Sequence, residues 1–359
     1  MGKKIVVFLV AAVLLAGALG AGSYLFMKHL LGNPNQPGAP VIVYDLKPGT
    51  SFWKMTQELE DLGVWKSAKL VRLYAKINKR AARIKIGEYE ISGQQSPRQI
   101  LELFTSGKGK PRVVTIPEGD NIVDVANAVE LAGLATKDVF LRAARNPELI
   151  QKYIGVKADS FEGYLFPETY NFSKYTTVES ILQAMVAQFE SQYQRALAEV
   201  PASERPSRIK DWDRHRIVTM ASLIEKETGA PQERPMISSV FFNRLDQGMK
   251  LQTDPTILYG KFVASGSMPN NISKADLLAP STYNTYVIFG LPPGPICNPG
   301  LDAMKAALRP VISKNLFFVS KNDGTHVFTE NYKAHEKAVN FYQKDARQRQ
   351  GKSWRDLKK

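Results

Sequence analysis

The strongest pattern in the sequence is an apolar run near its start. Residues 5–26 contain no charged side chain, and these 22 residues suffice to cross a bilayer as one helix. We therefore predict a membrane-spanning helix over residues 5–27. A cleavable signal peptide is the alternative, but the run exceeds the usual apolar region of about 7–15 residues. Lys3 and Lys4 precede the run, which predicts that residues 1–4 stay in the cytoplasm and the rest is exported.

A short polar segment follows the apolar run. Residues 28–40 are rich in proline, glycine and asparagine, a composition typical of linkers. We predict a spacer that holds a domain off the membrane, with the folded part starting near Val41.

An internal repeat begins at residue 41. Eight positions recur in the same order 70 residues later, and each copy has the pattern of a short strand, a glycine turn and an amphipathic helix that ends at glycine. The second halves recur at a spacing of 81, which implies about eleven extra residues in the second copy. We predict two α+β modules, at residues 41–110 and 111–190. The matched positions are Leu46, Gly49, Phe52, Met55, Leu59, Leu62, Gly63 and Val64, against Ile116, Gly119, Ile122, Val125, Val129, Ala132, Gly133 and Leu134.

Chance recurrence is the alternative to a repeat. The matched glycines argue against it, because a tight turn and a helix stop both need a positive φ. Each module resembles the small peptidoglycan-binding LysM type. The insert carries aromatic side chains with Glu162 and Glu168, which either line a sugar groove or pack against the next domain.

The rest of the chain predicts a third domain. Residues 191–213 contain two prolines and several charges and indicate a connection. A third α+β domain is predicted over residues 214–345, followed by a charged tail over 346–359. Its predicted elements are a helix at 217–228, a second helix that ends at Gly248, a hairpin of strands at 316–320 and 326–329, and a helix at 332–344.

Composition narrows the function only slightly. The net charge of +14 indicates an anionic partner, and export of the basic portion argues against nucleic acid. Cys297 is the only cysteine, so an internal disulfide and a thiolate metal cluster are excluded. The four histidines are scattered without ligand spacing, and we predict neither a metal nor another cofactor.

Glu227 is the candidate for chemistry. In a helix at residues 217–228, Glu227 shares a face with three aliphatic residues, while Glu225 lies about 160° round the helix. Burial disfavours the carboxylate and raises its pKa, and the negative end of the helix dipole acts in the same direction. A glutamate that stays protonated near neutral pH can donate a proton to a leaving oxygen. The alternative is an ordinary pair with lysine or arginine. The three aliphatic residues are Met220, Leu223 and Ile224.

Polar and aromatic side chains crowd the stretch between the second helix and the hairpin. Tyr283, Asn284 and Tyr286 offer stacking faces and amide hydrogen bonds that suit carbohydrate, although buried polar loops use the same residues. Asp254 precedes Pro255, and the pair is typical of a helix start with Asp254 as N-cap.

Five segments together resemble the endolytic murein transglycosylase family, the YceG-like proteins, and the likeness extends over nearly the whole chain. Glu162-Gly-Tyr-Leu-Phe-Pro-Glu-Thr-Tyr170 is similar to that family too. The five segments are Ala221-Ser-Leu-Ile-Glu-Lys-Glu-Thr228, Phe242-Asn-Arg-Leu245, Leu251-Gln-Thr-Asp-Pro-Thr256, Tyr283-Asn-Thr-Tyr286 and Gly290-Leu-Pro-Pro-Gly294.

The resemblance implies an enzyme of the bacterial cytoplasmic membrane that cuts peptidoglycan glycan strands internally and terminates their elongation beside peptidoglycan synthases. It implies an α+β chain with a membrane helix, two LysM-like modules and a catalytic domain over residues 214–345. Glu227 would act as acid and then as base, leaving 1,6-anhydro ends. The residues expected to bind substrate are Asn243, Arg244, Gln252, Asp254, Tyr283 and Asn284.

Two rival functions stay open. A hydrolytic muramidase would use Asp254 or Glu233 as a second carboxylate. A membrane-anchored, wall-binding scaffold without catalysis would keep the repeats and the basic charge, but it has no need of a carboxyl group beside an apolar stripe.

Overall fold

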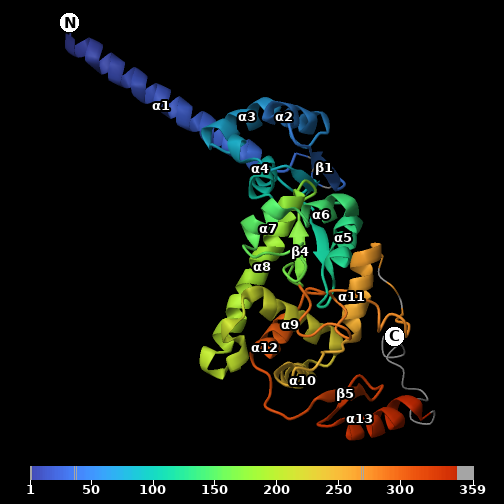
Figure 1. Cartoon of the computed structure of the whole chain (residues 1–359). Coiled ribbons are helices and arrows are strands. Elements are labelled where there is room, and N and C mark those ends of the chain that lie inside the picture. Colours follow the sequence, from blue (N-terminus) through green and yellow to red (C-terminus); the bar gives the residue numbers. More distant parts are fainter. Residues whose placement is uncertain (1, 36, 38, 268, 270, 346–359) are drawn as a thin grey trace. The chain divides into compact units, whose positions relative to one another are not determined.

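The computed structural model describes residues 2–35, 37, 39–267, 269 and 271–345 (Figure 1). The predicted charged tail at 346–359 lies outside these residues. The chain is a mixed α+β protein, mostly helical, and its strands form three two-stranded sheets within the described part. It divides into two compact units, one of Met1–Val113 with Asn171–Thr176 and the other of Val114–Tyr170 with Thr177–Lys359.

A long apolar helix opens the first unit. Helix α1 (Gly2–Gly32) contains a 28-residue stretch, Ile5–Gly32, that is long and apolar enough to cross a membrane. The predicted N-terminal apolar helix is therefore confirmed, and it suits a membrane anchor or a signal. It also continues beyond residue 27, so part of the expected spacer is helical. Met27 and Leu31 are buried in the core of this unit.

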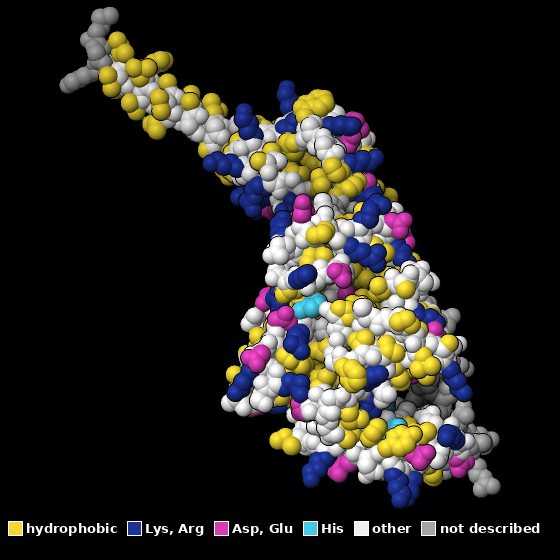
Figure 2. Space-filling view, viewed as in Figure 1, with side chains coloured by type: hydrophobic (Ala, Val, Ile, Leu, Met, Phe, Trp, Pro, Cys, Tyr) yellow, Lys and Arg dark blue, Asp and Glu magenta, His cyan; other side chains and the backbone are white. Residues whose placement is uncertain are grey.

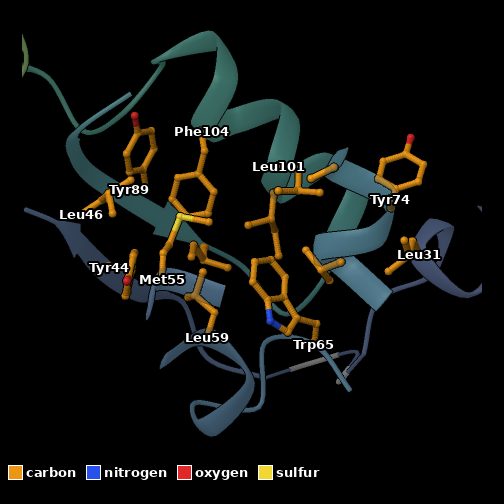
Figure 3. Close-up of a cluster of buried hydrophobic side chains, with 14 of the residues drawn as sticks. Leu31, Tyr44, Leu46, Met55, Leu59, Trp65, Tyr74, Tyr89, Leu101 and Phe104 are labelled. Atoms are coloured by element: carbon orange, nitrogen blue, oxygen red, sulfur yellow. The ribbon is translucent and has the colours of Figure 1, made fainter. Parts of the chain in front are cut away.

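The first unit has a strand, two helices and a second strand around one core. Strands β1 (Ile42–Leu46) and β2 (Gly87–Ile91) pair antiparallel, with Tyr44 opposite Tyr89. Helices α2 (Phe52–Asp61), α3 (Ala68–Ile77) and α4 (Pro97–Ser106) have serine N-caps, and the short η1 (Ala81–Arg83) precedes β2. Alternate residues of both strands point inward (Figure 3), and the buried cluster includes Leu31, Tyr44, Leu46, Met55, Leu59, Trp65, Tyr74, Tyr89, Leu101 and Phe104.

The same order of elements recurs from residue 112 onward. Strand β3 (Arg112–Thr115), helices α5 (Ile122–Leu131), α6 (Lys137–Ala143) and α7 (Pro147–Tyr153) and strand β4 (Thr169–Phe172) precede the long helix α8 (Val178–Glu199), and β3 pairs with β4. The four matched glycines have the expected positive φ. Each lies in a turn or just after a helix, where a residue with a Cβ would be strained in that conformation. The φ values are +80° and +83° at Gly49 and Gly119, and +73° and +68° at Gly63 and Gly133.

The start of the insert, residues 161–167, is buried in the core. This supports packing against the rest of the unit and argues against a sugar groove. Phe161, Tyr164 and Leu165 are fully buried. Glu162 is buried with them, and its carboxylate accepts from Ile122 N at the start of α5 (3.1 Å) and from the Tyr259 hydroxyl (3.0 Å).

Five α-helices, four shorter helical segments and a hairpin form the rest of the described chain. The short η2 (Ala202–Glu204) and η3 (Ser207–Asp211) lead to α9 (Arg214–Glu227), and η4 (Pro231–Glu233) to α10 (Arg234–Asp246). Helices α11 (Asp254–Ser265) and α12 (Leu301–Leu308) follow. The predicted hairpin is confirmed as β5 (Phe317–Ser320) and β6 (His326–Thr329), and α13 (Tyr332–Val339) and η5 (Asn340–Lys344) end the described chain.

Candidate active site

Glu227 is the last residue of α9, a helix whose middle part is buried on every side. The Asp213 carboxylate caps the start by accepting from Arg216 N (2.8 Å), and every residue from position 217 to position 225 is buried. Helices α10, α11 and α12 all contact α9. Met220, Leu223 and Ile224, on the face of Glu227, are 0% exposed, which confirms the predicted desolvation.

The Glu227 carboxyl group is held in a state that favours its proton. Burial, aided by the Asp254 carboxylate, raises the pKa of Glu227 from 4.5 to about 7, while Thr253 and Arg244 act in the opposite direction. Glu227 Oε1 is buried and has no hydrogen-bond partner among the described residues. The Thr253 hydroxyl likewise has none, so its influence on the pKa comes from proximity rather than from a well-formed hydrogen bond. A buried carboxyl oxygen without a partner is uncommon in folded proteins, and a catalytic role is one explanation for it.

The carboxyl group opens onto a cavity of about 300 Å³ in the second unit. The cavity has a polar side and an aromatic side, a combination common in ligand sites. Its lining residues are Glu227, Arg244, Leu251, Gln252, Asp254, Tyr286, Phe317, Phe318, Tyr332 and His335.

Arg244, near the end of α10, provides the fixed positive charge of the cavity. Its Nε donates to Leu316 O (2.6 Å), and its Nη1 donates to Leu251 O (2.8 Å) and to Gln252 Oε1 (3.3 Å). These bonds to carbonyl oxygens hold the guanidinium, and no described carboxylate forms an ion pair with it, so its charge acts on the cavity and on Glu227.

Gln252 reaches the cavity through an unusual backbone conformation. Its φ is +52°, a left-handed value that costs a non-glycine residue of order 1–3 kcal/mol. Leu251 and Thr253 on either side are buried, whereas Gln252 is exposed. Such strain persists where the surrounding structure fixes it, often at functional sites.

Asp254 differs from its expected role. The N-cap of α11 is Thr253, and Asp254 is the first helical residue and caps nothing. Its carboxylate instead accepts from the Tyr286 hydroxyl (2.7 Å) at the cavity. The N-cap prediction was wrong by one residue, since the helix starts at Asp254 and Pro255 is its second residue.

Three of the six residues expected to bind substrate do not line the cavity. Asn243 donates its amide to Ser313 O and Asn315 O (both 2.9 Å), and Asn284, which is buried, donates to Ala279 O (2.8 Å). Both amides fix the loops around the site. Tyr283 packs against the Tyr259 ring, with centroids 5.0 Å apart. Arg244, Gln252 and Asp254 are the three that lie beside Glu227.

The aromatic side of the cavity was missed from the sequence. His335 stacks on Phe317, with ring centroids 5.1 Å apart, and its Nδ1 is buried without a partner among the described residues. Burial and the Arg244 charge lower the pKa of His335, which favours the neutral ring. The hairpin and the last helix were expected, but nothing in the sequence places them beside α9. Among the described residues no cluster of His, Cys, Asp or Glu is arranged to hold a metal ion.

The other two glutamates near α9 have structural partners. Glu225 is buried, pairs with Arg234 (2.6 Å) and accepts from Gly300 N (2.9 Å). Glu233 is hydrogen-bonded to His326 Nδ1 (2.7 Å) and accepts from His326 N (2.9 Å), and it does not line the cavity.

A desolvated glutamate beside a polar, aromatic-walled cavity is typical of enzymes that cleave glycosidic bonds. The chain belongs to the YceG-like family, whose model matches residues 44–341. It is 32% identical to the endolytic murein transglycosylase of Bacillus subtilis over 89% of this chain and 90% of that protein. It is 28% identical to the endolytic murein transglycosylase of Streptococcus pneumoniae over 92% of this chain and 64% of that protein. A crystal structure of a YceG-like protein from Listeria monocytogenes shares 32% identity, covers 83% of this chain and 99% of that one, and gives a TM-score of 0.55.

Proposed function

We propose that this chain is a membrane-anchored lytic transglycosylase that cuts the β-1,4 bond between N-acetylmuramic acid and N-acetylglucosamine within nascent peptidoglycan strands. The observation that carries the proposal is the desolvated Glu227 carboxyl group, whose free Oε1 belongs to a residue that lines the cavity. The names of the relatives from Bacillus subtilis and Streptococcus pneumoniae support the substrate.

Glu227 supplies both proton transfers of the reaction. It first gives its proton to the glycosidic oxygen, and the C1–O bond breaks with the electron pair leaving on that oxygen. As a carboxylate it then takes the proton of the muramic acid C6 hydroxyl, whose oxygen closes onto C1 to form the 1,6-anhydro ring. No water is consumed. An intramolecular nucleophile reaches effective concentrations of about 10⁵–10⁸ M, so no second carboxylate is required.

The other cavity residues fit this reaction. The Arg244 charge stabilises the Glu227 carboxylate formed in the first step, and Asp254 keeps the resting acid protonated by repulsion. The aromatic side formed by Phe317, Phe318 and Tyr332 offers apolar faces for the pyranose rings.

A hydrolytic muramidase is the second candidate, because Asp254 lines the same cavity as Glu227. Glu233 is the weaker choice for the second carboxylate, since His326 occupies both of its oxygens. Hydrolysis leaves reducing ends, whereas the lytic reaction leaves anhydro-muramyl ends. Mass spectrometry of the products therefore separates the two candidates.

The segments outside the cavity have anchoring and binding roles. Helix α1 anchors the chain in the cytoplasmic membrane, with residues 1–4 in the cytoplasm and the two units outside. The strand–helix–helix–strand segments within 41–110 and 111–190 are LysM-like modules that bind glycan strands near the synthases, and residues 214–345 form the catalytic domain. The support is the shared element order and the paired positive-φ glycines.

The test compares purified full-length wild type with Glu227→Gln on isolated glycan strands. We expect Glu227→Gln to lose cleavage while its melting temperature and strand binding stay near those of wild type. Glu225→Gln is unsuitable as the control because it breaks a buried ion pair. Glu148→Gln, an exposed glutamate at the start of α7, is the matched control and keeps cleavage. Cleavage by Glu227→Gln would refute the assignment.

A further inference from the structure

The apolar run of α1 leads directly into the core of the first unit. Residues 5–26 are exposed, whereas Met27 and Leu31 are only 5% and 4% exposed. At 1.5 Å per residue, Leu31 lies roughly 8 Å beyond Phe26 along the helix. The headgroup layer on one side of a bilayer is about 5–8 Å thick. With α1 across the bilayer, the core of this unit therefore begins within the headgroup layer.

Helices α3 and α4 both contact α1. A cavity of about 260 Å³ between the end of α1 and the start of α3 is lined by apolar and basic residues together. One face of α3 packs into the core of the unit through Ala68, Val71, Tyr74 and Ala75.

The opposite face of α3 is basic and apolar at once. At 100° per residue, Lys69, Leu73, Lys76 and Ile77 fall within an arc of about 100°. Leu73 is 49% and Ile77 52% exposed, so two aliphatic side chains lie on the surface beside the lysines. Together with Lys66 before the helix, these residues are called the α3 face. None of its three lysines forms an ion pair with a described residue of this unit.

Charge is concentrated in the same part of the chain. Residues 28–113 contain fifteen Lys and Arg against seven Asp and Glu, a net charge of +8 out of +14 for the whole sequence. Figure 2 shows many Lys and Arg side chains over this unit beside α1. A basic surface with exposed aliphatic residues, next to a membrane helix, complements an anionic lipid surface.

We propose that the α3 face lies on the bilayer that holds α1 and binds its anionic lipid headgroups. The three lysines contact lipid phosphates, and Leu73 and Ile77 enter the boundary between headgroups and acyl chains. The inference rests on the membrane anchoring in the proposed function and extends it, because a bound α3 face fixes the first unit flat on the membrane. A protein partner for this face is the alternative, which the experiment separates.

The experiment places one environment-sensitive fluorophore on the full-length chain in lipid vesicles. Leu73→Cys carries the label, and the native Cys297 is fully buried and stays unlabelled. Val43→Cys is the matched control, since Val43 is also an exposed aliphatic residue of this unit (52%) but lies on β1. In vesicles with about a third phosphatidylglycerol we expect a blue shift and protection from an aqueous quencher at position 73 alone, and a weaker effect in pure phosphatidylcholine.

Charge reversal tests the lysines. Each lysine at an anionic surface contributes roughly fivefold to binding, so Lys69→Glu with Lys76→Glu should lower the contact equilibrium by about 25-fold or more. Lys47→Glu with Lys108→Glu makes the same charge change at exposed positions of the same unit and should keep the protection. High salt should weaken the contact in wild type.

Several results would overturn the inference. One is quenching of the label at position 73 by the aqueous quencher in both kinds of vesicle. The same result is expected if the α3 face binds a protein partner, because these vesicles contain no other protein. Equal loss in the two double variants would reduce the effect to overall charge. Glycan cleavage is measured on the same samples in detergent. Lost lipid contact with intact cleavage rejects only this inference, and absent cleavage with intact contact rejects only the proposed function.

Discussion

The basic limb of the pH–rate profile reports on Glu227. Burial raises the pKa of this carboxyl from 4.5 to about 7, a preference for the protonated form of roughly 3 kcal/mol. The reaction starts from the protonated acid, so kcat should fall as the pH rises through this pKa. About one pH unit above it, about a tenth of the maximal rate should remain.

Asp254→Asn should displace this limb in a known direction. The Asp254 carboxylate raises the pKa of Glu227, so removing its charge lowers that pKa and moves the limb to lower pH. Asp254 is exposed, and exposed charges interact by about 0.2–1 kcal/mol, which corresponds to a few tenths of a pH unit. The assay is kcat for release of anhydro-muramyl ends from purified glycan strands, measured at closely spaced pH values.

A matched substitution far from the cavity serves as the control. Asp138→Asn makes the same charge change at an exposed position of α6 and should leave the limb in place. A limb that moves to higher pH in Asp254→Asn would contradict the electrostatic reasoning. Loss of cleavage at every pH would give Asp254 a role in bond breaking and favour the hydrolytic mechanism.

Four further substitutions test the structure around the site. Thr253→Val removes a group that lowers the pKa of Glu227, so the basic limb should move to higher pH in the same assay. Glu225→Gln breaks a buried ion pair and should cost about 3 kcal/mol of stability in chemical denaturation. Burial raises the pKa of Glu162 to about 8, so its contribution to stability is full below pH 4.5 and is lost as the pH rises through 8. In Glu162→Gln the melting temperature should therefore fall less over this pH range than in wild type. Gly163→Ala places a Cβ 2.5 Å from Pro295 Cγ at a φ of +84° and should cost about 2–4 kcal/mol, seen as a lower melting temperature.

Local periodicity predicted much of the fold. The spacing of Met220, Leu223 and Ile224 before Glu227 identified the helix and the desolvated carboxyl, because a helical face is set by residues within two turns. The hairpin and the paired glycine turns were predicted for the same reason, since each depends on a few adjacent residues. These features need no knowledge of what packs against them.

The rest of the site depends on contacts distant in sequence. His335 and Phe317 line the cavity of Glu227 from about a hundred residues away, and no periodicity connects them. The helical pattern placed Glu225 on another face of α9 than Glu227, but it did not show that Arg234 and Gly300 bind the Glu225 carboxylate. The helical periodicity separated two faces of α9, but it did not show that both faces are buried over residues 217–225.

The position of Glu227 at the end of α9 explains how a largely buried helix can present a reactive acid. Glu225, two residues earlier, is buried and has Arg234 as an ion-pair partner, because an unpaired buried charge is too costly. At the last helical residue the backbone stays packed while the side chain lines the cavity and has no permanent partner. Its acidity then depends first on desolvation rather than on a fixed charge. A substrate that fills the cavity and excludes water would therefore hold the proton on Glu227 until the glycosidic oxygen accepts it, since it adds to the burial that raises the pKa.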